Sequence, residues 1–166
     1  MKVKIKKLVK EAVIPSYAKD GDAGMDLTAT SVSYDNNGNI VYGTGLAFEI
    51  PKGYVGLLFP RSSNANTNLY LTNSVGVLDS GFRGEVKFKY KPVHNVASSL
   101  RWFWENKIMK KKNPCIGIQT LIHNMYSVGD RIGQIIIIPY PQIEFEEVEE
   151  LTKTERGNGG YGSTGR

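Results

Sequence analysis

Short runs that alternate apolar and polar residues recur along this chain, and turn residues separate them. The first run, Met1 to Leu8, alternates lysines with apolar residues, and Glu85-Val86-Lys87-Phe88-Lys89-Tyr90 has the same period of two. This period is typical of strands, while Asn36-Asn37-Gly38 and Pro51-Lys52-Gly53 are typical of the turns between them. We therefore predict an all-β fold, a distorted jelly-roll barrel, in which residues 1–9 form an edge strand protected by lysines.

Length and composition favour one domain over residues 1–166. A chain of 166 residues can bury roughly two-thirds of its unfolded surface in a single core, and its hydrophobic fraction of 40% is ordinary. No apolar run approaches the roughly 20 residues of a membrane helix, and the N-terminus lacks the features of a signal peptide. Cys115 is the only cysteine, and His94 and His123 lack metal-ligand spacing. We expect a cytoplasmic protein without disulfides, membrane contact or a cysteine-based zinc site.

Positive charge is concentrated in one part of the chain. Residues 89–128 carry seven basic residues and one acidic residue, whereas the whole chain has a net charge of +5. The 44 residues between Gly84 and Gly129 are far more than a hairpin connection needs. We interpret 89–128 as an inserted element with a helix capped by Asn95 or Ser98, running from Leu100 to Lys112 and ended by Asn113-Pro114. Its aromatic residues favour either a protein-binding surface or packing on the barrel.

A glycine-rich stretch, Gly76 to Gly84, contains a single carboxylate, Asp79, between two strand-like runs. We interpret it as the tip of a β-hairpin in which glycines let a flat ligand approach the main chain and Asp79 activates water. A simple chain reversal is the alternative, because Asp-Ser-Gly is common in turns. Two interpretations also fit the segment Pro60-Arg61-Ser62-Ser63, namely a phosphate-binding loop and an ordinary loop.

Asp26 lies in a short, predominantly apolar run, Ala23 to Ala29, which we predict to be a buried strand. A buried carboxylate without a partner costs several kcal/mol, so we expect a guanidinium, another cation or metal-bound water beside it. The run Ile135 to Ile138 predicts a strand buried on both faces. Residues 156–166 are rich in glycine, and composition alone is typical of a flexible tail.

Five segments, in this order, resemble the five motifs of the trimeric dUTPases: Ala23–Leu27, Pro60–Ser63, Gly76–Gly84, Gly129–Gln134 and Arg156–Gly165. The resemblance implies a cyclic homotrimer with shared active sites that hydrolyses dUTP to dUMP and pyrophosphate with Mg²⁺. This reaction limits uracil incorporation into DNA and supplies dUMP for thymidylate synthesis. It also implies that residues 156–166 form an arm that closes over the site.

Roles follow from the resemblance residue by residue. Asp79 is the expected general base, and Asp26 is expected to lie behind the Mg²⁺ that the triphosphate carries. Uracil and deoxyribose are expected to contact Asn73, Gly76, Val77, Leu78, Phe82, Lys87 and Tyr161. The phosphates are expected to contact Arg61, Ser62, Ser63, Gln134, Arg156, Gly162, Ser163 and Thr164. Phe82, Ser63 and Tyr161 depart from the residues that many members have, which are tyrosine, glycine and phenylalanine respectively.

The long insertion is a further departure from compact members, and with it the chain resembles the dUTPases of bacteriophages of Gram-positive cocci. Some of these bind bacterial repressors, so residues 89–128 are a candidate repressor-binding element. One alternative is an inactive barrel that only sequesters a repressor. Another is a nucleic-acid-binding module using Lys107, Lys110, Lys111 and Lys112, which we do not favour because the catalytic-looking segments are nearly neutral. A dCTP deaminase of the same fold is disfavoured because the central motif matches the hydrolase.

Overall fold

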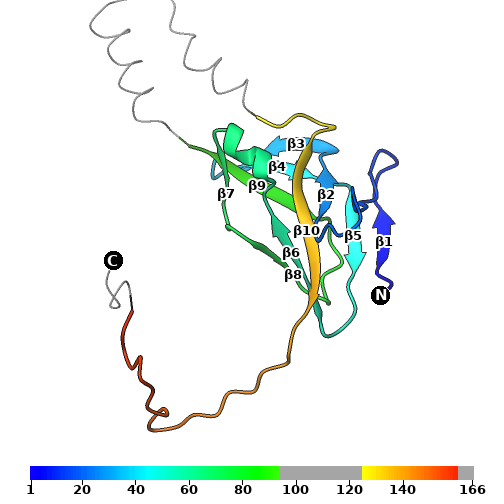
Figure 1. The fold of residues 1–166 in the computed structure, drawn as a ribbon. Coiled ribbons are helices and arrows are strands. Elements are labelled where there is room, and N and C mark those ends of the chain that lie inside the picture. The colour runs from blue at the N-terminus through cyan, green and yellow to red at the C-terminus, as the bar shows by residue number, and fades with distance from the viewer. Residues whose placement is uncertain (94–124, 161–166) are drawn as a thin grey trace, which may run out of the picture.

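The computed structural model describes residues 1–93 and 125–160, in which nearly all regular secondary structure is β-strand (Figure 1). This confirms the predicted fold class. The strands and the one short 3-10 helix of this part are β1 (Lys4–Lys7), β2 (Met25–Thr28), β3 (Ser31–Tyr34), β4 (Ile40–Gly43), β5 (Leu46–Glu49), β6 (Tyr54–Phe59), η1 (Ser62–Asn66), β7 (Leu69–Leu71), β8 (Gly76–Leu78), β9 (Lys87–Pro92) and β10 (Arg131–Pro139).

Two four-stranded antiparallel sheets enclose the core of a distorted jelly roll. Their strand orders are β2-β10-β6-β8 and β3-β4-β9-β7, and β1 pairs with β5 in a separate two-stranded sheet. Apolar side chains from all three sheets form one buried cluster, because alternate residues of each strand point inward. Its largest fully buried members are Tyr42, Tyr90, Phe88, Leu27, Ile40, Leu46, Ile132 and Ile135.

The prediction for Ile135 to Ile138 was only partly correct. Ile135 is completely buried in the core, but Ile136 and Ile137 are half-buried and Ile138 is 39% exposed. The run lies in β10, which pairs with β2 and β6 on its two edges. The second face of its C-terminal half is therefore uncovered within one chain.

The hairpin interpretation of Gly76 to Gly84 was also only partly correct. The flanking strands β7 and β9 do pair, with Leu71 opposite Tyr90. Gly76 to Leu78, however, forms β8, which pairs with β6 in the β2-β10-β6-β8 sheet and not with β7 or β9. Gly76 and Leu78 are both buried there, and a side chain at Gly76 would press against Leu58. Packing against Leu58 therefore places this stretch in the opposite sheet from β7 and β9.

β1 is an edge strand, as predicted. It pairs on one side with β5, and Lys4 Nζ lies 2.8 Å from Glu49 Oε1 on that strand. Within residues 1–93 and 125–160, no helix is long and apolar enough to cross a membrane.

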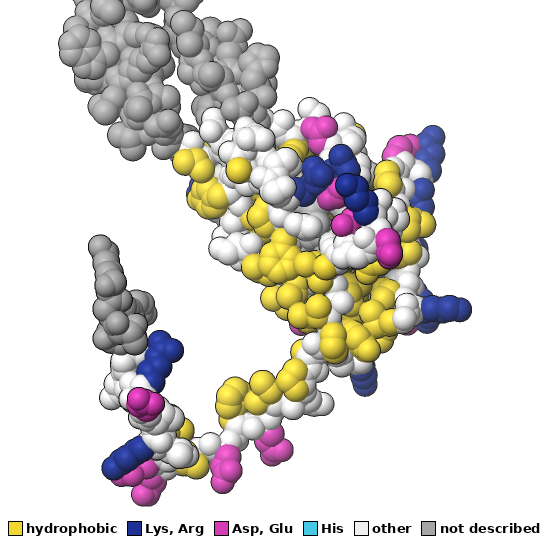
Figure 2. All heavy atoms as spheres, in the orientation of Figure 1, with side chains coloured by type: hydrophobic (Ala, Val, Ile, Leu, Met, Phe, Trp, Pro, Cys, Tyr) yellow, Lys and Arg dark blue, Asp and Glu magenta, His cyan; other side chains and the backbone are white. Residues whose placement is uncertain are grey.

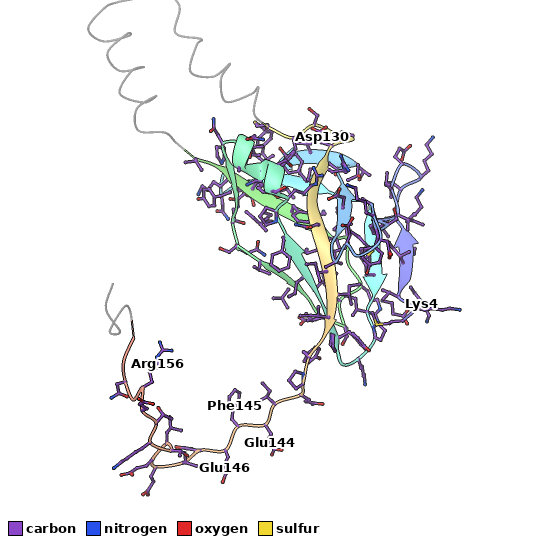
Figure 3. All side chains as sticks on the ribbon, viewed as in Figure 1. Lys4, Asp130, Glu144, Phe145, Glu146 and Arg156 are labelled. Carbon is purple, nitrogen blue, oxygen red and sulfur yellow. The ribbon has the colours of Figure 1, made fainter. Side chains whose placement is uncertain are left out.

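After β10 the chain leaves the barrel as an extended arm (Figures 1 and 3). Tyr140 N donates to Gly53 O over 3.0 Å. Among the described residues, none after Tyr140 makes a hydrogen bond to the barrel. Several apolar side chains of the arm are exposed, and Phe145 has the largest exposed fraction, 92%.

The inserted element predicted at 89–128 is described only at its two ends. Lys89 to Pro92 belong to β9, and residues 125–128 lead back into β10. The predicted helix Leu100 to Lys112, Cys115 and both histidines lie outside the described residues.

Candidate active site

Strand pairing brings three of the predicted phosphate-site segments together. β10 lies between β2 and β6, so that Gln134 is opposite both Asp26 and Phe59. The loop that follows Phe59 therefore begins beside Gln134, whose Nε2 donates to Pro60 O over 3.1 Å. Residues far apart in the sequence thus meet at one end of this sheet.

Asp26 has the cationic partners that its apolar surroundings required. Its Oδ1 accepts from Arg61 Nε at 2.7 Å, and its Oδ2 accepts from Arg131 Nη1 at 3.1 Å. The side chains of Asp26 and Arg61 are each 26% exposed, whereas that of Arg131 is 57% exposed. Because Arg61 is held by the more shielded pair, Asp26 fixes its orientation more tightly than that of Arg131.

Arg61 also contacts the serines that follow it. Its Nη1 donates to Ser63 Oγ over 3.2 Å, and Ser63 is half-buried within η1. Ser62 is exposed. Guanidinium and hydroxyl groups held in this way can bind the oxygens of a phosphate.

Sequence reasoning did not assign roles to Gly24 or to Arg131. A side chain on Gly24 would collide with the amide of Gln134, so glycine at this position leaves room for that amide. The signal available was a glycine inside a predicted strand, which often marks a close approach. Arg131 is three positions before the predicted Gln134 in the sequence. Its pairing with Asp26 depends on the register between β10 and β2, which the sequence does not reveal.

Asp79 directly follows β8 and is exposed. Its carbonyl accepts the N–H of Phe82 at 3.1 Å, and Arg83 Nη1 donates to the carbonyls of Ser80 and Phe82. Backbone bonds therefore shape this turn. Within the part of the chain that the structure describes, the Asp79 carboxylate accepts no hydrogen bond, which leaves both oxygens available to water.

Four of the predicted base and sugar residues, Asn73, Gly76, Val77 and Leu78, lie in β8 or in the turn before it. Asn73 is exposed in the preceding turn, and Val77 points outward with 64% of its surface exposed. β8 is the last strand of its sheet. One edge of its backbone pairs with β6, and the other edge pairs with no strand among the described residues. Free N–H and C=O groups on such an edge are suited to reading a flat base.

Phe82 and Lys87 lie on either side of Gly84. The Phe82 ring covers Gly84, where a side chain would be only 2.6 Å from the ring. Lys87 Nζ is 3.1 Å from Glu85 Oε2, so its ammonium is already paired. The backbone of Lys87 is therefore the part that suits the expected ligand contact.

The expected site residues form two groups in one chain rather than one. Leu78 is opposite Gly56, near the start of β6, whereas Arg61 follows the other end of that strand. A strand rises about 3.4 Å per residue, so Asp79 and Arg61 are separated by roughly 15–20 Å along β6. Within one chain, the general base and the phosphate cluster are therefore apart.

Arg156, the one expected tail residue that the structure describes, is near neither group. Arg156 lies on the arm, away from the barrel, and its Nε donates to Gly159 O over 2.9 Å (Figure 3). The other expected tail residues, Tyr161, Gly162, Ser163 and Thr164, lie outside the described residues.

The charged groups suit Mg²⁺ only if it arrives with the nucleotide. Both Asp26 oxygens are engaged by arginines. Among residues 1–93 and 125–160, no group of three His, Cys, Asp or Glu side chains is placed to hold a metal. Mg²⁺ commonly takes its ligands from substrate phosphates and water. Asp26 therefore fits an outer-sphere position rather than direct coordination.

Comparison with known proteins agrees with this arrangement. A family model described as dUTPase matches residues 10–97 and 122–165. A deoxyuridine 5'-triphosphate nucleotidohydrolase of Nautilia profundicola is 39% identical over 168 residues and covers 100% of both chains. One from Corynebacterium glutamicum is 37% identical, covering 99% of this chain and 95% of the relative.

The barrel also matches a solved structure. The dUTPase of Staphylococcus bacteriophage 80alpha with dUpNHpp is 25% identical, has a TM-score of 0.73 and covers 99% of both chains. The family match spans most of the described barrel and both ends of the predicted insertion. Sequence and fold thus agree that the chain belongs to the dUTPase family.

Proposed function

We propose that this chain hydrolyses dUTP to dUMP and pyrophosphate, which limits uracil incorporation into DNA and supplies dUMP for thymidylate synthesis. The observation that carries the proposal is the Asp26–Arg61–Ser63–Gln134 cluster, built from three motif segments of the family. Full-length relatives named as deoxyuridine 5'-triphosphate nucleotidohydrolases support it.

In the proposed reaction, Asp79 accepts a proton from a water molecule as that water attacks the α-phosphorus. The bond from this phosphorus to the α,β-bridging oxygen breaks, and pyrophosphate leaves. Arg61, Ser63 and Gln134 hold the phosphates, and the free edge of β8 binds uracil. Phe82 stacks against the deoxyribose and leaves no room for a 2'-hydroxyl. Bound Mg²⁺ supplies charge neutralisation on the phosphates.

The separation of Asp79 from Arg61 supports a site shared between chains. A nucleotide bound to the Arg61 cluster of one chain would then be attacked by water at Asp79 of another, as expected for the cyclic homotrimer.

Apolar surface supports the same assembly. Ile136, Leu57 and Val77 are direct neighbours across β10, β6 and β8, and none of them is buried in the core. Figure 2 shows apolar side chains gathered over this face, and further ones along the arm. A second chain on this face would cover the exposed part of β10 and bury surface that water now contacts.

A coupled assay for dUMP and pyrophosphate, with dUTP and Mg²⁺, tests the activity. We expect turnover of dUTP and none of dCTP or dTTP. Release of ammonia from dCTP would instead indicate the deaminase. Absence of any turnover by the folded protein would refute the proposed reaction.

A second function, binding of a bacterial repressor through residues 89–128, is favoured by one observation. The family model leaves residues 98–121 unmatched. The dUTPase of phage 80alpha has been described as controlling transfer of virulence genes by a G protein-like mechanism. We therefore propose that this chain is of the bacteriophage type and that the unmatched segment is an insertion that contacts the partner.

A pull-down of candidate repressors with the full chain and with a chain lacking residues 98–121 tests this function. Loss of binding with retained dUTP turnover is expected. Undiminished binding would remove the insertion from the explanation.

A further inference from the structure

Three tyrosines pack together at the end of the barrel where the chain returns to β10. The ring of Tyr126 is 5.9 Å from that of Tyr42 and 5.6 Å from that of Tyr90, measured between centroids. Tyr90 is itself fixed, because its hydroxyl donates to Ile132 O over 2.6 Å in the core. The ring of Tyr126 is therefore anchored to a rigid part of the barrel.

The hydroxyl of Tyr126 reaches out of this cluster to the phosphate segment. It donates to Asn64 Oδ1 over 3.1 Å. Asn64 lies in η1, one residue after Ser63, and its Nδ2 donates to Leu69 O over 2.9 Å. Oδ1 also accepts from Thr67 Oγ1. The other hydrogen bonds of Asn64 are to residues 61–69, so Tyr126 is the described partner that ties it to a distant part of the chain.

Ser63 and Arg61 also influence the ionisation of this hydroxyl. Burial raises the pKa of Tyr126, and the charge of Arg61 and a hydrogen bond with Ser63 offset part of this rise. Ser63 in turn accepts from Arg61 Nη1. The bond from Tyr126 to Asn64 therefore holds η1 one residue away from Ser63, the serine that contacts the guanidinium.

We propose that Tyr126 is a positioning residue for the phosphate-binding segment Arg61–Asn64. Its hydroxyl holds η1 at a fixed distance from the core, so that Arg61 and Ser63 meet the phosphates without reordering. This inference rests on the proposed dUTP site, and it concerns the phosphate half of that site only. Base and sugar binding at β8 should therefore not depend on Tyr126.

The variant Tyr126→Phe tests this because it keeps the ring and removes the hydroxyl. A hydrogen bond of this kind contributes a factor of roughly 3 to 10 in binding. We expect the dissociation constant of dUpNHpp to rise by about that factor, measured by titration calorimetry. The inhibition constant of 2'-deoxyuridine, which has no phosphate, should change less than about twofold.

Tyr42→Phe is the matched control. Tyr42 belongs to the same cluster, and its buried hydroxyl has no hydrogen-bond partner among the described residues, although the backbone of Tyr126 is close. Its removal should leave both affinities unchanged. Asn64→Ala should weaken dUpNHpp binding at least as much as Tyr126→Phe, because it removes the same bond and two further side-chain bonds. The double variant should be no weaker than Asn64→Ala alone, because the Tyr126–Asn64 bond is already absent there.

Unchanged dUpNHpp affinity in folded Tyr126→Phe would overturn the inference. An equal loss for dUpNHpp and deoxyuridine would also overturn it, because that result indicates a general structural effect. If the parent protein neither binds dUpNHpp nor turns over dUTP, the proposed function itself fails, which is a separate result.

Discussion

Arg61 donates from Nε to Asp26 Oδ1 over 2.7 Å, although the two residues are 35 positions apart in the chain. This pair uses one edge of the guanidinium and directs Nη1 toward Ser63. The orientation of Arg61, which we propose to bind the phosphates, therefore depends on a residue that need not touch the substrate.

Replacing Asp26 by Asn tests that dependence. The change leaves Arg61 and Arg131 without a carboxylate, and we expect a loss of about 1–2 kcal/mol in the free energy of unfolding. We expect kcat/KM for dUTP to fall at least roughly tenfold, because Arg61 is no longer held in place. Glu49→Gln is the control: it breaks the exposed pair with Lys4 and should change stability by less than about 0.5 kcal/mol. Equal effects of the two variants would contradict the prediction.

Replacing Asp79 by Asn should abolish most turnover and leave nucleotide binding intact. General base catalysis contributes roughly 10²- to 10⁴-fold, and the exposed carboxylate does not stabilise the turn, whose bonds come from backbone groups and Arg83. Single-turnover rates and the dissociation constant of dUpNHpp measure the two effects. A rate within tenfold of the parent would argue against Asp79 as the base.

Hybrid oligomers test whether the site is shared between chains. Asp79→Asn and Arg61→Ala should each be inactive alone. After the two are unfolded and refolded together in equal amounts, about a quarter of the sites in a cyclic trimer would combine an intact Asp79 with an intact Arg61. Recovery of activity is expected in this mixture, measured as dUMP release. If both residues acted within one chain, no site would be complete and no activity would return.

Removing residues 156–166 should reduce turnover far more than thermal stability. The hydrogen bonds of the described residues 156–160 are made within the arm, so their removal breaks no hydrogen bond of the barrel. Thermal unfolding and kcat, measured on the same samples, separate the two effects. Arg156→Gln in the full chain shows how much of the loss is due to one cation. A truncated protein with the parent rate would refute a role for the arm.

Stability should depend on pH through Asp35. Hydrogen bonds from the Asn39 side chain at 2.9 Å and its backbone N–H at 3.0 Å hold the pKa of Asp35 far below its ordinary value of 3.8. A lowered folded-state pKa stabilises the protein above pH 3.8, and this contribution is lost as the pH falls toward the lowered value.

Urea unfolding of the parent and Asp35→Asn checks this effect. The parent should be the more stable at neutral pH, and the difference should narrow as the pH falls below 3.8. A constant difference across this range would show that the carboxylate charge is not the cause.

Much of the fold could be predicted from local patterns. Alternation identified the edge strand β1, and Asn36-Asn37-Gly38 identified the turn between β3 and β4, where Gly38 has a φ of 74°. These signals are local because side-chain period and turn geometry depend on neighbouring residues only.

The remaining features depend on which strands pair. The strand Gly76–Leu78 has only three residues. A pattern of alternating apolar and polar side chains that short cannot show whether the strand pairs with β7 or with β6. Apolar surroundings predicted a cation beside Asp26, but strand order determined that the partners are Arg61 and Arg131. Tyr126 carried no sequence signal, since its bond to Asn64 joins residues 62 positions apart.

The two ends of the connection between β9 and β10 are attached to the same short stretch. Val93 N donates to Asn68 O over 2.7 Å, and Tyr126 is bonded to Asn64. The barrel is therefore closed at this point whatever lies between them. Because the entropy of closing a loop grows only slowly with its length, protein engineers can lengthen or replace the connection between these two points while the barrel beneath keeps its shape.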